Sequence, residues 1–518
     1  MRQHLAVVDI LPDARISGVP MNAGPNEDTL GFRWRDAVLR GVEPPPAAFL
    51  TRRPFHPWLI VIVSCISGFM GQLDASIVQL TLPALKSALD ASVNDVRWVA
   101  IAYLLTYAAC LPVFGRVSEM RGRKILFLMG FALFTLATLL CGLAPDLASL
   151  VAFRVLQGVG GAMLGANSIA ILVKSIDESR RARAIGLYTA AQAIGISSGP
   201  MVGGLLLYAL DWRWVFWAGV PFGLSALVLG WLVLPRSVDL AVDKKFDWPG
   251  ALLLMPSLVL AILALNQVSV WPLASPAMVL CILASAAFMV LFARRERVTT
   301  YPLVNLGLFS RKAFACGIVG VGLGYALLYG MFFLMSFALM HGFHDSAQVA
   351  GFKLAIIPVT LGLIAPLSVT LSGRWGSHTV GVAGMALCAA ALLALSVIAL
   401  KPIGSLVSGL AAFAMFGVGL GLFITPNSNA TIAAAPASAS GEAAAVINLF
   451  RVFGSCIGVS SASSMMSWRM EAMAGSAGRD VFLAGHPLIE AVESSLILLI
   501  VFALIAGCAS LVRPRGPA

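Results

Sequence analysis

The segment from Gly115 to Lys124 has the sequence G-R-V-S-E-M-R-G-R-K and lies between two long apolar stretches. It carries four cationic groups, one acid and two glycines. A segment this basic cannot lie in hydrocarbon, and it is too short to fold alone. Because Lys and Arg accumulate in the short cytoplasmic loops of membrane proteins, we expect a cytoplasmic loop that joins two membrane-spanning helices.

The composition of the whole chain agrees with this interpretation. Of its 518 residues, 59% are hydrophobic and only 11% are charged, which excludes an ordinary water-soluble protein. Fourteen apolar runs are long enough to cross ~30 Å of hydrocarbon at ~1.5 Å per residue. Their cores start near Trp58, Val96, Ile125, Leu147, Ala184, Val215, Trp248, Ala277, Phe314, Gly351, Val380, Leu406, Ala443 and Leu496. The sequence therefore predicts an all-α integral membrane protein with fourteen transmembrane helices.

The net charge of +11 is better explained by membrane orientation than by a nucleic-acid partner. With the amino terminus inside, most of the 35 Lys and Arg residues fall on the cytoplasmic side. The basic residues expected outside are Lys86, Arg97, Arg213, Lys353, Lys401, Arg469 and Arg479. We expect both termini to face the cytoplasm of a bacterium, with the chain in its inner membrane.

Polar connectors after the sixth and eighth runs divide the chain into four parts. We expect a cytoplasmic tail at 1–56, a six-helix bundle at 57–234, a linker with two inserted helices at 235–312 and a second six-helix bundle at 313–518. A weak repeat supports this division, because Ser372–His378 follows the second run of the last six as Gly115–Lys124 follows the second run of the first six. Repeated halves around a central site are typical of secondary transporters.

Asp74 is the only acid well inside any predicted helix. A charge near the middle of the bilayer costs at least ~2.5 kcal/mol, so it must face a cavity, a partner or a proton. Small or polar groups recur along one face of its helix, which we expect to line a central cavity. These residues are Ser67, Gly71, Asp74, Val78 and Thr81. The alternative is an acid that only hydrogen-bonds a neighbouring helix.

Arg154 lies at a matching depth in the fourth predicted helix, ~10 to 12 Å from the same face. Its fixed positive charge could set the protonation of an acid in the cavity. The alternative is a structural arginine that binds backbone carbonyls of a neighbouring helix.

Several motifs resemble those of the major facilitator superfamily. Gly115–Lys124 resembles the loop between its second and third helices, G-x-L-x-D-R-x-G-R-R/K, and Arg154–Gly161 resembles the fourth-helix motif R-x-x-Q-G-x-G. Gly195–Gly204 resembles the exporter signature G-x-x-x-G-P-x-x-G-G, and Asn448–Gly454 resembles N-x-x-R-x-x-G. With the helix count, these motifs are similar to those of the 14-helix drug:proton antiporters of EmrB/QacA type. Glu119 stands where the loop motif usually has Asp.

The resemblance implies a major facilitator fold and a proton-coupled exporter of small amphipathic or lipophilic compounds, not an enzyme. It implies a proton-coupling and substrate cavity at Asp74, Arg154, Gln157, Gln72 and Asn448. It implies a conformational loop formed by Gly115, Arg116, Glu119, Arg121, Gly122, Arg123 and Lys124. It implies an exporter motif in the fifth helix, formed by Gly195, Gly199, Pro200, Gly203 and Gly204. We expect no metal and no cofactor, with the proton gradient as the energy source.

Other functions remain open at this stage. A major facilitator that takes up or exports one metabolite or a siderophore would share the fold. A subunit of a respiratory complex would need buried lysines and glutamates along several helices, and a membrane enzyme would need a metal-binding loop or a sizeable outer domain. The partners we expect are a small-molecule substrate and the lipid bilayer. The sequence leaves open the identity of the substrate and whether a periplasmic membrane-fusion adaptor binds.

Overall fold

The computed structural model describes residues 43, 45–237, 246–268, 270–272, 274–300, 302–399, 406–436, 439–474 and 486–512. Within these ranges every long element is a helix, and fourteen helical segments are long and apolar enough to cross a membrane. They coincide with the fourteen predicted runs, so that prediction is confirmed. Most of the tail expected at 1–56 lies outside the described residues, which begin with Glu43 and the short helix α2 (Ala48–Thr51).

The helices fall into an early group, a middle pair and a late group. The early group is α3 (His56–Ala88), α4 (Val93–Val96), α5 (Trp98–Arg121), α6 (Arg123–Gly142), α7 (Leu147–Ser175), α8 (Glu178–Ala209), α9 (Arg213–Trp217) and α10 (Val220–Val233). The middle pair is α11 (Trp248–Gln267) and α12 (Pro276–Val298). The late group is η1 (Leu306–Ser310), α13 (Lys312–Phe337), η2 (Ala338–Gly342), α14 (Ala347–Trp375), α15 (Ser377–Ala394), η3 (Leu395–Ala399), α16 (Leu406–Ala433), α17 (Ser440–Ala474) and α18 (His486–Val512).

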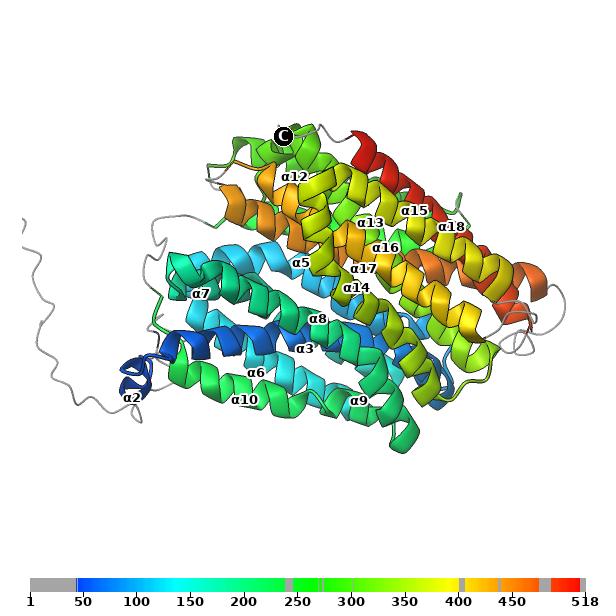
Figure 1. Ribbon diagram of the computed structural model, residues 1–518, viewed down its shortest axis with the longest axis horizontal. Coiled ribbons are helices and arrows are strands. Elements are labelled where there is room, and N and C mark those ends of the chain that lie inside the picture. Colours follow the sequence, from blue (N-terminus) through cyan, green and yellow to red (C-terminus); the bar gives the residue numbers. More distant parts are fainter. Residues whose placement is uncertain are drawn as a thin grey trace, which may run out of the picture.

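The early and late groups lie side by side and meet along several helices (Figure 1). The main contacts between them join α8 to α14, α5 to α17 and α3 to α13. Helix α12 packs mainly on α11, and α11 packs on α17 and α5. We call the end of the bundle next to α2, where α5 ends and α6 begins, the motif end, and the opposite end, which carries α9, the far end (Figure 1).

The expectation of a loop at Gly115–Lys124 is wrong in one respect. Helix α5 continues to Arg121, and α6 begins at Arg123, so Gly122 alone separates the two helices. Gly122 has φ +107°, a backbone conformation that side chains with a Cβ rarely adopt. The glycine therefore turns the chain in a single residue, and most of the basic groups lie on helix ends.

Helix α7, which carries Arg154, has a well-defined start. The Asp146 side chain accepts a hydrogen bond from the Ser149 backbone N–H at 2.8 Å, and Ser149 bonds back to the Asp146 backbone N–H. This reciprocal arrangement satisfies backbone donors that have no partner within the first turn. The bonds from Ser149 also hold the pKa of the Asp146 carboxyl below its ordinary value.

Candidate functional site

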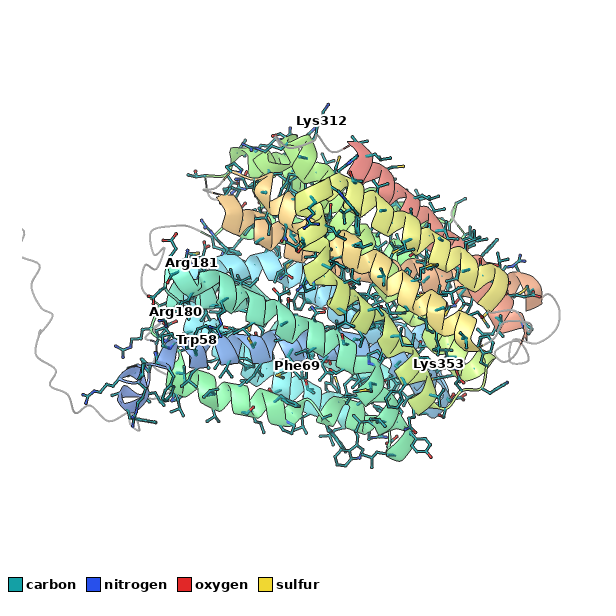
Figure 2. The ribbon with its side chains drawn as sticks, viewed as in Figure 1. Trp58, Phe69, Arg180, Arg181, Lys312 and Lys353 are labelled. Atoms are coloured by element: carbon teal, nitrogen blue, oxygen red, sulfur yellow. The ribbon has the colours of Figure 1, made fainter. Side chains whose placement is uncertain are left out.

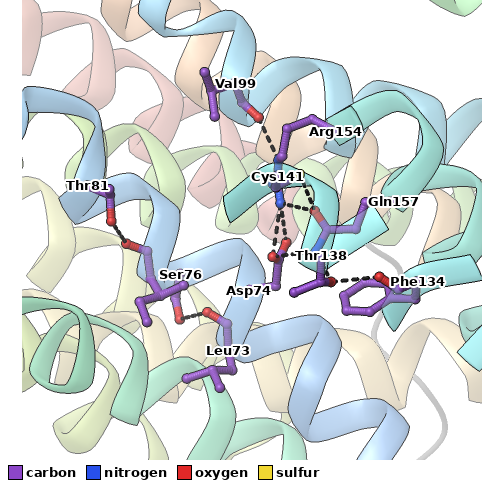
Figure 3. A network of polar contacts seen from close by, with 11 residues as sticks. Leu73, Asp74, Ser76, Thr81, Val99, Phe134, Thr138, Cys141, Arg154 and Gln157 are labelled. Carbon is purple, nitrogen blue, oxygen red and sulfur yellow. Dashed lines mark hydrogen bonds and ion pairs between the residues drawn. The ribbon is translucent and has the colours of Figure 1, made fainter. Parts of the chain in front are cut away.

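Asp74 and Arg154, from helices α3 and α7, meet directly in the interior of the bundle (Figure 3). The Arg154 Nη1 group donates to both carboxylate oxygens of Asp74, at 2.9 and 2.7 Å. Both side chains are buried, with 8% of Asp74 and 1% of Arg154 exposed. The matching depths expected from the sequence therefore correspond to a buried ion pair.

Gln157 completes this group from the next turn of α7. Its amide Nε2 donates to Asp74 Oδ1 and to Thr138 Oγ1, each at 2.8 Å, and its Oε1 accepts from Arg154. The Arg154 Nε group donates to the Val99 backbone carbonyl at 2.8 Å (Figure 3). The carboxylate thus accepts hydrogen bonds from two side chains at once.

A cavity lies between the early and late helices beside this group. Residues from α3, α5, α6, α7, α8, α13 and α17 line it. They are Ser67, Gly68, Gly71, Gln72, Ala75, Tyr103, Leu104, Tyr107, Phe134, Gly161, Leu164, Gly165, Ser168, Tyr188, Gln192, Tyr325, Tyr329, Arg451, Val452 and Ser455. Five of the seven tyrosines of the chain are on this wall.

The structure places the expected cavity residues in three different situations. Gln72 lines the cavity, whereas Asn448 lies one helical turn before Arg451 and accepts a hydrogen bond from it. That Asp74 faces the cavity stays a prediction, since in this conformation Asp74 is not among the lining residues. The reason is that Arg154 and Gln157 hold the carboxylate toward α7.

The rest of the small and polar stripe on α3 divides in the same way. Ser67 and Gly71 line the cavity, while Val78 and Thr81 are fully buried in the packing of the helices. Tyr103 stands between the cavity and the ion pair, since its ring lines the cavity and lies 4.3 Å from the Arg154 guanidinium carbon. A ligand in the cavity would therefore contact the ion pair through this ring.

The five residues of the expected exporter motif lie on α8, and the motif contacts α3 and α14. Gly195, Gly199 and Gly203 pack on α3. At the far end, a Cβ added to Gly204 would clash with the Ala347 carbonyl oxygen, and one added to Gly351 of α14 would clash with the Pro200 carbonyl oxygen. These helices therefore approach backbone to backbone at the far end.

At the motif end, Glu43 and Ser237 hold the basic motif Gly115–Lys124 in place, and neither residue was expected from the sequence. Glu43 accepts hydrogen bonds from the Ile125 backbone N–H at 3.3 Å and from the Ser237 hydroxyl at 3.0 Å. The Ser237 hydroxyl also accepts a bond from the Arg123 backbone N–H at 2.8 Å. A carboxylate at the first turn of α6 compensates its unpaired backbone donors. Glu43 and Ser237 therefore hold the start of α6 in place.

Within the motif itself, Glu119 lies 2.8 Å from Arg116 and 3.7 Å from Arg123. Gly115 has open space beside its Cα, and the Arg121 side chain is exposed. Lys124 is fully buried and donates to the Leu234 carbonyl. In this conformation Glu119 thus pairs with arginines of its own motif.

Arg97, one of the basic residues expected outside, has its side chain in the interior of the protein. Its side chain is fully buried and donates to the hydroxyls of Ser463 and Ser464, at 3.2 and 3.3 Å, and to the Asn266 carbonyl. Arg97 thus connects the early helices to α17 and α11 at the far end.

The sequence carries a signal for the tyrosine wall, by which we mean the five tyrosines that line the cavity. Tyr103 and Tyr107 are four residues apart on α5, and Tyr325 and Tyr329 are four residues apart on α13, so each pair shares one helix face. The signal for Glu43 was absent, because its contacts are with residues far along the chain.

Comparisons with known proteins agree with this geometry. The sequence profile of the Major Facilitator Superfamily matches residues 64–459. The riboflavin transporter RibZ of Clostridioides difficile (strain 630) is 29% identical over 79% of this chain and 88% of its own length. The puromycin resistance protein pur8 of Streptomyces alboniger is 32% identical over 78% of this chain and 80% of its own length. A bacterial homologue of the human lysosomal transporter Spinster, solved in an inward-facing and unoccupied conformation, has a similar structure. The TM-score is 0.61 at 15% sequence identity, and the match covers 90% of this chain and 100% of that chain.

Proposed function

Because the chain belongs to the Major Facilitator Superfamily and is a multi-pass membrane transporter, not an enzyme, we propose that it exports small amphipathic or lipophilic compounds in exchange for protons. The exchange proceeds by alternating access, in which the cavity opens first to one side of the membrane and then to the other. No cofactor takes part, and the proton gradient supplies the energy.

The observation that supports this proposal most strongly is the group of Asp74, Arg154 and Gln157 beside the cavity. A proton that binds Asp74 neutralises the carboxylate and weakens its bonds to Arg154. The Tyr103 ring, which lies over Arg154 and also lines the cavity, transmits the change to a bound substrate. Substrate and proton thereby bias the same group in opposite directions.

The energy available is sufficient for this exchange. A proton that crosses down a potential of ~100 mV releases ~2.3 kcal/mol, which supports a roughly 50-fold gradient of a neutral substrate. Export is favoured over uptake by the similarity of Gly195–Gly204 to the exporter signature and by the relative whose name describes puromycin resistance.

The proposed orientation follows from the distribution of basic residues. Arg180 and Arg181 lie at the same end as Trp58, and Lys353 lies at the opposite end (Figure 2). That first end is the motif end, where Arg121, Arg123 and Lys124 also lie. We place it and both chain termini in the cytoplasm of a bacterium. The far end, where α8 and α14 meet, then faces outward. A periplasmic membrane-fusion adaptor at that face is a further proposal.

Replacement of Asp74 with Asn tests the proposal. Asn keeps an oxygen that can accept from Arg154 but cannot carry the proton, so the protein should fold and insert while losing at least about tenfold in substrate-driven proton release. The measurement uses proteoliposomes with an enclosed pH dye and puromycin or riboflavin as probe. Asp211→Asn is the matched control, because Asp211 lies at the far end in an exposed pair with Arg213. Export and proton release at wild-type levels in Asp74→Asn would contradict the proposal.

A second function is favoured by one observation. RibZ, by its name, transports riboflavin, and the cavity here is lined by five tyrosines that suit a flat aromatic molecule. The chain would then transport one specific metabolite. The direction of riboflavin movement in inverted membrane vesicles separates this function from multidrug export.

A further inference from the structure

The charge of the cavity is set by residues on different helices. Arg451 of α17 is the only charged side chain among the described residues that line it. The nearest acid group of the site, Asp74, is already bound by Arg154 at 2.7 Å and by Gln157 at 2.8 Å. Because Asp74 and Arg154 neutralise each other, the cavity has an excess of one positive charge.

The surroundings of Arg451 do not balance that charge. Its side chain donates to the neutral Asn448 amide oxygen, and its guanidinium lies 5.8 Å from the centre of the Tyr325 ring. The ionisable groups that act on it are the hydroxyls of Tyr107, Tyr188, Tyr325 and Tyr329. Within the described part of the chain, no carboxylate forms an ion pair with it. A cation in the membrane interior that has only neutral partners attracts an anion from the solvent.

The remaining wall suits a planar aromatic molecule. Tyr103 and Tyr107 have ring centres 6.1 Å apart, and Phe134 meets Tyr103 edge to face at 6.4 Å. Gln72 of α3 and Ser455 of α17 add polar groups to the lining of the cavity. Aromatic walls bind flat rings through stacked and edge-to-face contacts, and a guanidinium adds charge-assisted hydrogen bonds to an acidic group.

We propose that this cavity selects flat aromatic compounds that carry a negative charge, that it disfavours lipophilic cations, and that Arg451 is the residue that decides between them. The inference rests on the proposed function, since it takes the cavity to be the transport site. It narrows the substrate class from amphipathic compounds in general to aromatic anions.

Two dyes that share a xanthene ring system and differ in charge test the inference. Fluorescein is an anion and rhodamine 123 is a cation. Fluorescence polarisation of each dye is titrated with the purified protein in lipid nanodiscs, without any proton gradient. The wild-type protein should bind fluorescein at least about tenfold more tightly than rhodamine 123. Arg451→Gln should abolish this preference, and Arg451→Lys should keep most of it because the charge remains.

Arg374→Gln is the matched control, since it removes the same charge from an exposed position at the motif end of α14. Thermal unfolding shows that each variant is folded. Equal or tighter binding of rhodamine 123 to the wild type would overturn the inference. So would a preference that persists in Arg451→Gln, or the absence of fluorescein binding to the wild type at millimolar concentration.

The outcome is independent of proton coupling, because no gradient is present. If Asp74→Asn still transports while Arg451→Gln loses the preference, the proposed coupling fails and the charge selection stands. If Asp74→Asn loses coupling while Arg451→Gln keeps the preference, the charge selection fails and the proposed function stands.

Discussion

At the scale of single residues, the molecule places an ion pair where the bilayer offers no water. Asp74 and Arg154 are buried, and removing one partner of a buried pair typically costs about 3 to 5 kcal/mol because the other charge is left alone. Gln157 and the Val99 carbonyl share the remaining bonds of this group. Both charges are tolerated because each has hydrogen-bond partners.

Arg154→Lys should weaken coupling although it keeps the charge. A lysine has no planar fork, so it cannot bond Asp74, Gln157 and the Val99 carbonyl together. We expect a loss of about 1 to 3 kcal/mol in stability and about tenfold in substrate-driven proton release. The release is measured in proteoliposomes, with Arg213→Lys, in an exposed ion pair, as the control. Unchanged release in Arg154→Lys would refute a coupling role for Arg154.

At the scale of helices, the contact of α8 with α14 closes the far end without side chains between the backbones. Gly204 lies against Ala347, and Gly351 lies against Pro200. Rigid halves that rock must make and break such a contact repeatedly, and glycine allows a close fit without interlocking side chains. The exporter signature therefore has a direct role in packing the two halves together.

Gly351→Ala should open this contact. The added Cβ would meet the Pro200 carbonyl oxygen, and overpacking of this kind costs about 1 to 3 kcal/mol in the closed conformation. We expect a longer distance between spin labels at Tyr208 and Val349, and severalfold slower transport. Gly362→Ala on the same helix is the control, because its added Cβ would meet nothing within 4 Å. An equal distance change in both variants would show that the effect is not due to the close approach.

At the scale of the whole molecule, the early helices, the middle pair and the late helices are joined at one buried cation. Arg97 reaches α17 through Ser463 and Ser464 and reaches α11 through the Asn266 carbonyl. The middle pair is thereby connected to the surface along which the two halves meet.

Arg97→Gln should loosen the far end as a whole. It removes charge-assisted hydrogen bonds, worth about 1.5 to 3 kcal/mol when buried, from two helices at once. We expect a lower unfolding temperature and faster thiol labelling of Ser463→Cys by a water-soluble maleimide. Arg213→Gln, which changes a half-buried arginine paired with Asp211 at the same end, should change neither quantity. Slow labelling in Arg97→Gln would show that other contacts keep the far end closed.

Some of the site could be predicted from the sequence and some could not. The depths of Asp74 and Arg154 follow from counting residues along helices of known rise, and the two side chains do meet. Counting could not show that Arg154 turns Asp74 away from the cavity, because that depends on the rotation of α3 relative to α7. Nor could counting show that Arg97 is buried. Its partners, Ser463 in the late group and Asn266 in the middle pair, lie far from it along the chain.

The number and approximate positions of the membrane helices were determined by the sequence alone, because each helix must satisfy its own backbone hydrogen bonds in hydrocarbon, and this demand is local. Tertiary structure alone decided three features of the site. It brought the tyrosine pairs together around one cavity, left the charge of Arg451 without an acidic partner, and placed the Glu43 carboxylate at the first turn of α6. These features join residues from several helices or from distant segments. Their contacts depend on how the helices rotate and pack against one another, which no local pattern of residues specifies.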